Sequence, residues 1–257
     1  METSDNVNVI LGSDLSSAWA KVFCKVYEHT NSEISPLLVT FPYTDLASIE
    51  QSSIYMNLDE ELLLHKSNSI NTIANTIFPI SLWNSNKNRK ILFERYQKNL
   101  RHILKDRRNS KGVYFQRLIA FQTNDAEPVN QLEHIITTWN GNNHRRSALQ
   151  AQIFNPYTDH SHARILGFPC LDQIVFNVTG NTLKITGVYA MQYIFDKALG
   201  NYLGLARLGK FMAHEMNLEL SEISCIACTA KLSDKTKGKL KDFYIQLSAS
   251  IGGVNGG

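Results

Sequence analysis

The chain has 257 residues, of which 43% are hydrophobic and 19% charged, a composition typical of a globular protein with a core of its own. Its net charge of +3, spread over interrupted basic runs, excludes the densely basic surface of a protein that coats nucleic acid. The first residues do not resemble a secretory leader and no apolar run approaches the length of a membrane span, so we expect a cytoplasmic protein with reduced cysteines that binds neither nucleic acid nor a membrane.

The N-terminal half carries patterns of both helices and strands. Asp14 is placed to cap a helix whose apolar face has helical spacing, formed by Leu15, Trp19, Val22, Phe23, Val26 and Tyr27. Pro128 suits the first turn of a second helix, over residues 129–139, which Gly141 ends. The other predictions in this half are strands at residues 36–41, 118–121 and 144–154, a strand and a short helix within 45–65, and a polar helix within 84–110.

The C-terminal half alternates between strand and helix patterns. Its predicted elements are strands at residues 173–178, 182–189 and 223–232 and a helix at 191–216. Gly180-Asn181 is a turn signal, so the first two of these strands are predicted to form a hairpin. Three glycines interrupt the helical pattern and indicate close packing against another element: Gly200, Gly204 and Gly209.

Two pairs of residues offer candidate chemistry. Pro169-Cys170 places a cysteine between a loop and a strand, where a neighbouring cation would favour the thiolate and make it a nucleophile. Arg145-Arg146 offers two guanidinium groups, each able to bind a phosphate through forked hydrogen bonds. Taken alone, each pattern is better explained by structure, as a buried cysteine and as one exposed and one salt-bridged arginine.

The order and spacing of several motifs together resemble the thymidylate synthase family. The motifs are Gly112-Val113-Tyr114, Asn130-Gln131-Leu132, His144-Arg145-Arg146, Phe154-Asn155-Pro156, Pro169-Cys170, Phe176-Asn177-Val178, Leu183, Asn201 and Leu218-Glu219-Leu220. A shared order of separate motifs is more specific than any one of them. The resemblance covers residues 110–235, without gaps from Cys170 to Leu220, whereas residues 1–100 match poorly.

The resemblance implies a fold, an assembly and an activity. The fold would be a single domain over residues 1–257 of the α+β class, a thymidylate synthase-like three-layer α/β arrangement with a large mixed sheet backed by helices. Two chains would form a homodimer through the face of the sheet. The activity would be that of an enzyme transferring a methyl or hydroxymethyl group from 5,10-methylenetetrahydrofolate to C5 of a pyrimidine nucleotide.

The resemblance also implies roles for individual residues. Cys170 would add to C6 of the pyrimidine, and Tyr114 would help order water and proton transfer near C5. Arg145-Arg146 would reach across the homodimer interface to the nucleotide phosphate of the partner, and their charge would favour the Cys170 thiolate. Asn201 would pair with the edge of the base through its amide, and Lys231, where the family has a histidine, would contact the phosphate or the sugar.

Several family residues are replaced in this chain. Leu171 follows the cysteine in place of a histidine, Ala190 stands in place of a phosphate-binding arginine, and Tyr193 in place of the aspartate that holds the pterin. Asn75 is a candidate for the position of the catalytic glutamate. Two functions therefore stay open: one-carbon transfer to C5 and, as the alternative, a nucleotide-binding relative that kept the fold and lost the chemistry.

Two further patterns resemble metal or redox sites. Cys225-Ile226-Ala227-Cys228 has the spacing of a redox pair, but the segment has a strand pattern, and a strand would point the two cysteines to opposite faces. Asp159-His160-Ser161-His162 offers possible metal ligands without an evident fourth. We therefore expect buried structural thiols and no metal.

Overall fold

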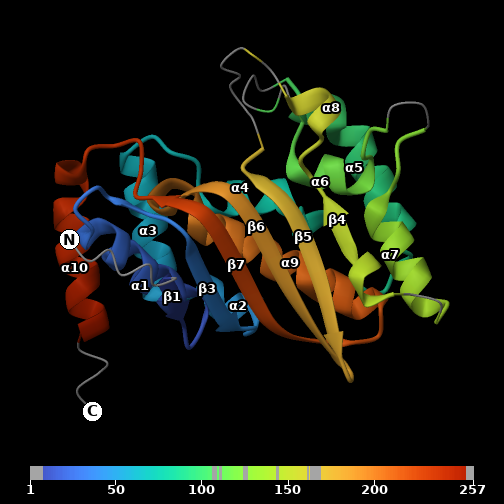
Figure 1. Cartoon of the computed structure of the whole chain (residues 1–257), viewed down its shortest axis with the longest axis horizontal. Coiled ribbons are helices and arrows are strands. Elements are labelled where there is room, and N and C mark those ends of the chain that lie inside the picture. Colours follow the sequence, from blue (N-terminus) through green and yellow to red (C-terminus); the bar gives the residue numbers. More distant parts are fainter. Residues whose placement is uncertain are drawn as a thin grey trace.

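The computed structural model describes residues 8–105, 109, 112–123, 127–142, 145–160, 162 and 169–252. These residues form an α+β fold in which one large mixed sheet is backed by helices (Figure 1). The sheet has seven strands in the hydrogen-bonded order β1-β3-β7-β6-β5-β4, with β2 beside β7. The predicted fold class, α+β with a large mixed sheet, is therefore confirmed.

The strands pair in both directions. They are β1 (Asn8–Leu11), β2 (Glu33–Ile34), β3 (Leu37–Pro42), β4 (Gln150–Gln152), β5 (Leu171–Thr179), β6 (Thr182–Tyr193) and β7 (Glu219–Lys231). The pairs β1–β3 and β6–β7 are parallel, and the other pairs are antiparallel. β5 and β6 form the predicted hairpin, and Gly180 in its turn has a φ of 58°, which glycine adopts without steric cost.

The helices of the described residues vary from one turn to about five turns in length. They are α1 (Leu15–Glu28), α2 (Leu46–Glu50), α3 (Ser53–Leu64), α4 (Ile70–Ile77), α5 (Lys90–Ile103), α6 (Tyr114–Ile119), α7 (Gln131–Asn140), α8 (Pro156–Asp159), α9 (Leu199–Glu215) and α10 (Lys241–Gly252). Asp14 caps α1 as predicted, since its carboxylate accepts from the backbone N–H of Ser17. Within the ranges given above, no helix is long and apolar enough to cross a membrane.

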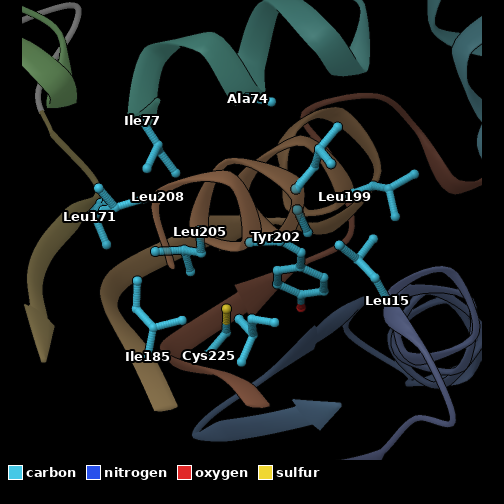
Figure 2. Close-up of a cluster of buried hydrophobic side chains, with 14 of the residues drawn as sticks. Leu15, Ala74, Ile77, Leu171, Ile185, Leu199, Tyr202, Leu205, Leu208 and Cys225 are labelled. Atoms are coloured by element: carbon cyan, nitrogen blue, oxygen red, sulfur yellow. The ribbon is translucent and has the colours of Figure 1, made fainter. Parts of the chain in front are cut away.

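The central helix, α9, is the middle of the core. Most of its residues are buried, on every side of the helix, because it lies between the sheet and α4. Figure 2 shows this layering: Ile77 of α4 lies on one side of α9, and Ile185 and Cys225 of the sheet lie on the other. A helix buried all round needs apolar residues on every face, which the sequence of α9 provides.

Glycines let α4 and α9 approach closely, as the interrupted helical pattern predicted. A Cβ atom added to Gly200 would lie 2.6 Å from Cβ of Ile73, and one added to Gly204 would lie 2.8 Å from Cβ of Ile77. Both distances are well below van der Waals contact. The small residues of α9 therefore fix how near α4 can lie, and α4 carries part of the site described below.

The two faces of the sheet differ in burial. Side chains that point toward α9 are buried, among them Phe176, Ile185 and Ile223. Their neighbours along the strands point the other way and are half-buried or exposed, including Val188 and Ile226, which pair in register. Figure 1 shows α4 and α9 behind the sheet, so this second face is the one toward the viewer.

Several predicted elements were wrong in type or extent. Residues 118–121 are not a strand, because Leu118 and Ile119 belong to α6 and pack with Phe115 in the core. Residues 45–65 hold two helices and no strand, and α4 was not predicted. Of residues 145–154, only Gln150–Gln152 form a strand. The predicted helix at 191–216 begins late, since β6 continues to Tyr193 and a π-helical turn, Ile194–Ala198, precedes α9.

Candidate active site

A cavity of about 680 Å³ lies at the end of the sheet where β5 begins and β6 ends. Its wall is completed by α4, the 3-10 turn Ile80–Leu82, α5, the start of α6, the π-helical turn and the start of α9. This volume is typical of pockets that enclose small organic ligands. Segments far apart in the sequence therefore meet in one cavity.

Three of the residues singled out from the sequence line this cavity together. Cys170 lies directly before β5, Tyr114 is the first residue of α6, and Asn201 lies in the first turn of α9. The backbone of Cys170 and Leu171 hydrogen-bonds the Tyr114 hydroxyl, which ties α6 to the start of β5. Burial raises the pKa of Tyr114, so its hydroxyl stays protonated at neutral pH.

The Cys170 thiol is held in a mixed electrostatic environment. Burial raises its pKa, the carboxylate of Asp172 raises it further, and the ammonium of Lys197 lowers it. Burial also raises the pKa of Asp172 to about 6, although the backbone N–H of Ala190 hydrogen-bonds its carboxylate. The free protein therefore holds Cys170 as a thiol at neutral pH, and Lys197 is the neighbour that favours the thiolate.

Lys197 was missed in the sequence, where it has no motif around it. It lies in the π-helical turn between β6 and α9, a type of turn that often occurs at functional sites. The neighbouring Asp196 anchors this turn: burial alone would raise its pKa, but hydrogen bonds from Lys235, Ser233 and Ser67 outweigh burial and hold the pKa below its usual value. The hydrogen bonds to Asp196 thus hold the turn in place, and Lys197 of the same turn lines the cavity.

The polar part of the cavity wall is dominated by amides. Six amide side chains contribute to it, and they are Asn68, Asn75, Asn99, Asn109, Gln192 and Asn201. Among the described lining residues there is no carboxylate, and Lys197 is the one cation. Such a wall hydrogen-bonds a polar neutral ring and tolerates a negative charge better than a positive one.

Arg145 and Arg146 lie away from this cavity. They sit at the 3-10 turn before β4, both exposed. Gln150, which follows this turn, pairs with Val175, five residues and roughly 16 Å along β5 from Cys170. The charged groups that most affect the Cys170 thiol are Asp172 and Lys197. Within one chain, the arginine pair is therefore not among the charged groups that act on the thiol, and its expected effect across a homodimer interface stays a prediction.

Lys231 lies beside the cavity without lining it. It is the last residue of β7 and pairs in register with Tyr193, which does line the cavity. Its ammonium lies 5.7 Å from the centre of the Tyr193 ring and 3.6 Å from a carboxylate oxygen of Asp234. Lys231 is thus positioned to steady Tyr193 at the rim, and a ligand would have to extend past that ring to reach it.

A folate fits the described wall only in part. Apolar and aromatic residues such as Ile103, Tyr96 and Tyr193 offer surfaces for a flat ring. The pterin edge presents N–H donors, which a carboxylate binds best, and no described lining residue is a carboxylate. The residues present therefore do not match the pterin end of a folate.

The metal and redox patterns have structural explanations. Asp159 accepts two hydrogen bonds from Arg117 and is buried, so it serves an ion pair. The described residues contain no group of three or more histidine, cysteine, aspartate or glutamate side chains that could hold a metal. Cys225 is buried and Cys228 is exposed, as expected of residues that point to opposite faces of a strand. The expectation that both thiols are buried is therefore wrong for Cys228, which lies on the face of the sheet turned away from α9.

The cavity therefore combines a thiol, a cation, a protonated phenol and a set of amides. The described part of this wall differs from the residues expected from the resemblance in having no carboxylate and in having Lys197. Asn75, a candidate for the position of the family glutamate, is part of the wall. No protein-family model matches this chain, and no curated protein matches it.

Proposed function

We propose that this protein activates a pyrimidine nucleotide by adding Cys170 to C6 of the ring, so that C5 can accept a one-carbon group. The observation that carries the proposal is the meeting of Cys170, Tyr114 and Asn201 in one enclosed cavity. Those residues come from separate parts of the chain, and the fold brings them together. The motif order that resembles thymidylate synthases also supports it.

The chemistry follows from conjugate addition. The Cys170 thiolate forms a bond to C6, and the electrons of the C5–C6 double bond move to C5 and the oxygen at position 4. C5 then bonds to an electrophile, its original hydrogen leaves as a proton, and the electrons of the C5–H bond restore the double bond as the sulfur leaves. Lys197 favours the attacking thiolate, and the protonated Tyr114 can exchange protons beside it.

The one-carbon donor is a separate part of the proposal. 5,10-Methylenetetrahydrofolate is the donor that the resemblance implies, and the described wall does not match its pterin. Comparing the reaction with and without methylenetetrahydrofolate tests whether this compound is the donor.

The phosphate of the nucleotide is proposed to be bound by a second copy of the chain. Arg145 and Arg146 are exposed and lie away from the cavity of their own chain, and one face of the sheet carries half-buried apolar residues such as Val188. A homodimer through that face would let the arginines reach the partner. Light scattering is expected to give twice 29.1 kDa. Val188→Asp should give monomers, whereas Leu64→Asp, on the exposed side of α3, should not.

Exchange of the C5 hydrogen tests the proposal. UMP, dUMP, CMP and dCMP are each incubated with the protein in D₂O, with and without methylenetetrahydrofolate, and the H5 signal is followed by NMR. We expect loss of the signal for at least one nucleotide, abolished by Cys170→Ala and retained by Cys228→Ala. The second variant is a matched control, because Cys228 is an exposed thiol of β7 outside the cavity. Retention of H5 with every nucleotide would overturn the proposed chemistry.

The second candidate is a protein that binds the nucleotide and does not react with it. The raised pKa of the Cys170 thiol favours this alternative, because a protonated thiol is a weak nucleophile. The exchange experiment and a binding titration together separate the two. Binding without exchange, in both the wild type and Cys170→Ala, is the result expected of a binding protein.

A further inference from the structure

Asn75 of α4 is held from behind by a buried arginine of α9. Nη1 of Arg207 lies 3.1 Å from Oδ1 of Asn75, and Nη2 lies 2.8 Å from Oε1 of Glu50. Arg207 is 2% exposed, so its guanidinium is shielded from water, whereas the Glu50 carboxylate at the other end of the contact is partly exposed. The close packing of α4 on α9 brings the two side chains together.

This contact fixes which end of the Asn75 amide faces the cavity. A guanidinium carries only donors, so it can be satisfied only by the oxygen of the amide. The amide nitrogen of Asn75 is left for the cavity, which Asn75 lines, and it has no hydrogen-bond partner among the described residues. Asn75 therefore turns its two N–H donors toward the cavity, while its oxygen is engaged by Arg207.

Gln192 and Lys197 of the wall have the same polarity, whereas the nitrogen of Asn109 donates to the carbonyl oxygen of Ile103. The hydroxyl of Tyr202 donates to Oε1 of Gln192 at 3.4 Å, while Nε2 of Gln192 is buried without a partner in the described part of the chain. Lys197 carries only donors. A ligand that presents oxygen acceptors is therefore favoured over one that presents amino groups, because facing donors leave each other unsatisfied.

We propose that Asn75 is a specificity residue, which donates a hydrogen bond to the oxygen at position 4 of the ring and so selects uracil over cytosine. This inference rests on the proposed function. Cytosine carries an amino group at position 4, which would face the Asn75 donors. The addition of Cys170 to C6 moves negative charge to the oxygen at position 4, so the same donor supports the reaction. Arg207 is the positioning residue, since it acts on the ligand only through Asn75.

Paired titrations test this inference. Dissociation constants of UMP against CMP and of dUMP against dCMP are measured by calorimetry at pH 7.5. The wild type is expected to prefer uracil by roughly tenfold or more, the effect of one unmatched polar group. In Asn75→Asp one carboxylate oxygen still accepts from Arg207 and the other replaces the amide nitrogen, so this preference should vanish or reverse.

Two further variants serve as a control for the added charge and as a test of the positioning role of Arg207. Asn99→Asp puts the same carboxylate on another part of the same wall, and we expect it to weaken both nucleotides alike. Arg207→Lys keeps the charge but cannot bridge both partners, so Asn75 can turn over and the preference should fall several-fold. Circular dichroism and thermal melts establish that each variant folds.

A ligand series on the wild type keeps the inference testable if Asn75→Asp does not fold. A pyrimidin-2-one ribonucleotide lacks any group at position 4 and is expected to bind roughly tenfold more weakly than UMP. Three results would overturn the inference and leave the proposed function intact. The pyrimidin-2-one ribonucleotide could bind as tightly as UMP, Asn75→Asp could keep the wild-type preference for uracil, or the wild type could prefer cytosine. Failure of all four natural nucleotides to bind would overturn both.

Discussion

Substitution of Gly200 by alanine is expected to push α4 away from α9. The new Cβ would lie 2.6 Å from Cβ and 2.7 Å from Cγ2 of Ile73, and 2.9 Å from the carbonyl oxygen of Ile70. Carbon atoms at rest lie about 3.5–4.0 Å apart, so α4 must move by roughly 1 Å. A side-chain rotation cannot relieve the clash, because the nearest atoms are a Cβ and a backbone oxygen.

The expected change in the free energy of unfolding is the difference between two opposing effects. Overpacking of a tight core costs about 1–3 kcal/mol, and a clash with backbone belongs to the upper part of that range. Alanine gains about 1 kcal/mol over glycine inside a helix. We therefore expect Gly200→Ala to lower the free energy of unfolding by about 1–2 kcal/mol. Because Asn75 moves with α4, nucleotide binding should weaken as well.

Urea unfolding, followed by circular dichroism, measures the change in the free energy of unfolding. Gly238→Ala is the matched control, since a Cβ at Gly238 meets no atom within 4 Å. We expect that variant to stay within about 0.5 kcal/mol of the wild type. A Gly200→Ala protein as stable as the wild type, or more stable, would refute the packing argument.

Three further outcomes follow from the charged groups. Burial raises the pKa of Asp172 to about 6, so the folded protein binds this proton more tightly than the unfolded chain and loses stability as pH rises toward 7. Asp172→Asn should therefore raise the free energy of unfolding by about 1–3 kcal/mol at pH 7.5 and leave it unchanged below pH 4, as measured by urea unfolding. Asp172 raises the pKa of Cys170 and Lys197 lowers it, so Asp172→Asn should speed iodoacetamide labelling of Cys170 at pH 8 and Lys197→Met should slow it. Peptide mass spectrometry measures the labelling rates, and unchanged rates would contradict the proposed environment of the thiol. Asp159→Asn removes the buried carboxylate that ion-pairs with Arg117 and should lower the free energy of unfolding by about 3–5 kcal/mol. A loss under about 1 kcal/mol would mean that the pair is not buried in solution.

Two elements with a strong local signal were predicted correctly, whereas Pro128 does not open α7 as predicted, because Asn130 caps that helix. Asp14 marks the start of α1, and Gly180-Asn181 marks the turn between β5 and β6, because a cap and a tight turn each depend on a few adjacent residues. Short apolar runs were less informative. Leu118-Ile119 fits either a strand or a helix, and its contacts in the core decided for the helix.

The sequence predicted several residues of the candidate site, but only part of the geometry of the site. Cys170, Tyr114 and Asn201 were selected through the motif order, and all of them line the cavity. Lys197 has no local signal, because its importance comes from the π-helical turn that presents it. The arginine pair shows the reverse: a strong local pattern that lies away from the cavity of its own chain.

The sequence by itself determined the elements whose signals are local and the residues capable of chemistry. Tertiary structure decided which of those residues share a cavity and which end of each amide faces it. Arg207 and Asn75 are 132 residues apart, and the contact between them exists only because Gly200 and Gly204 let α4 pack closely on α9. Hydrogen-bond polarity depends on partners brought together by packing, and packing between distant segments leaves no periodic pattern in the chain.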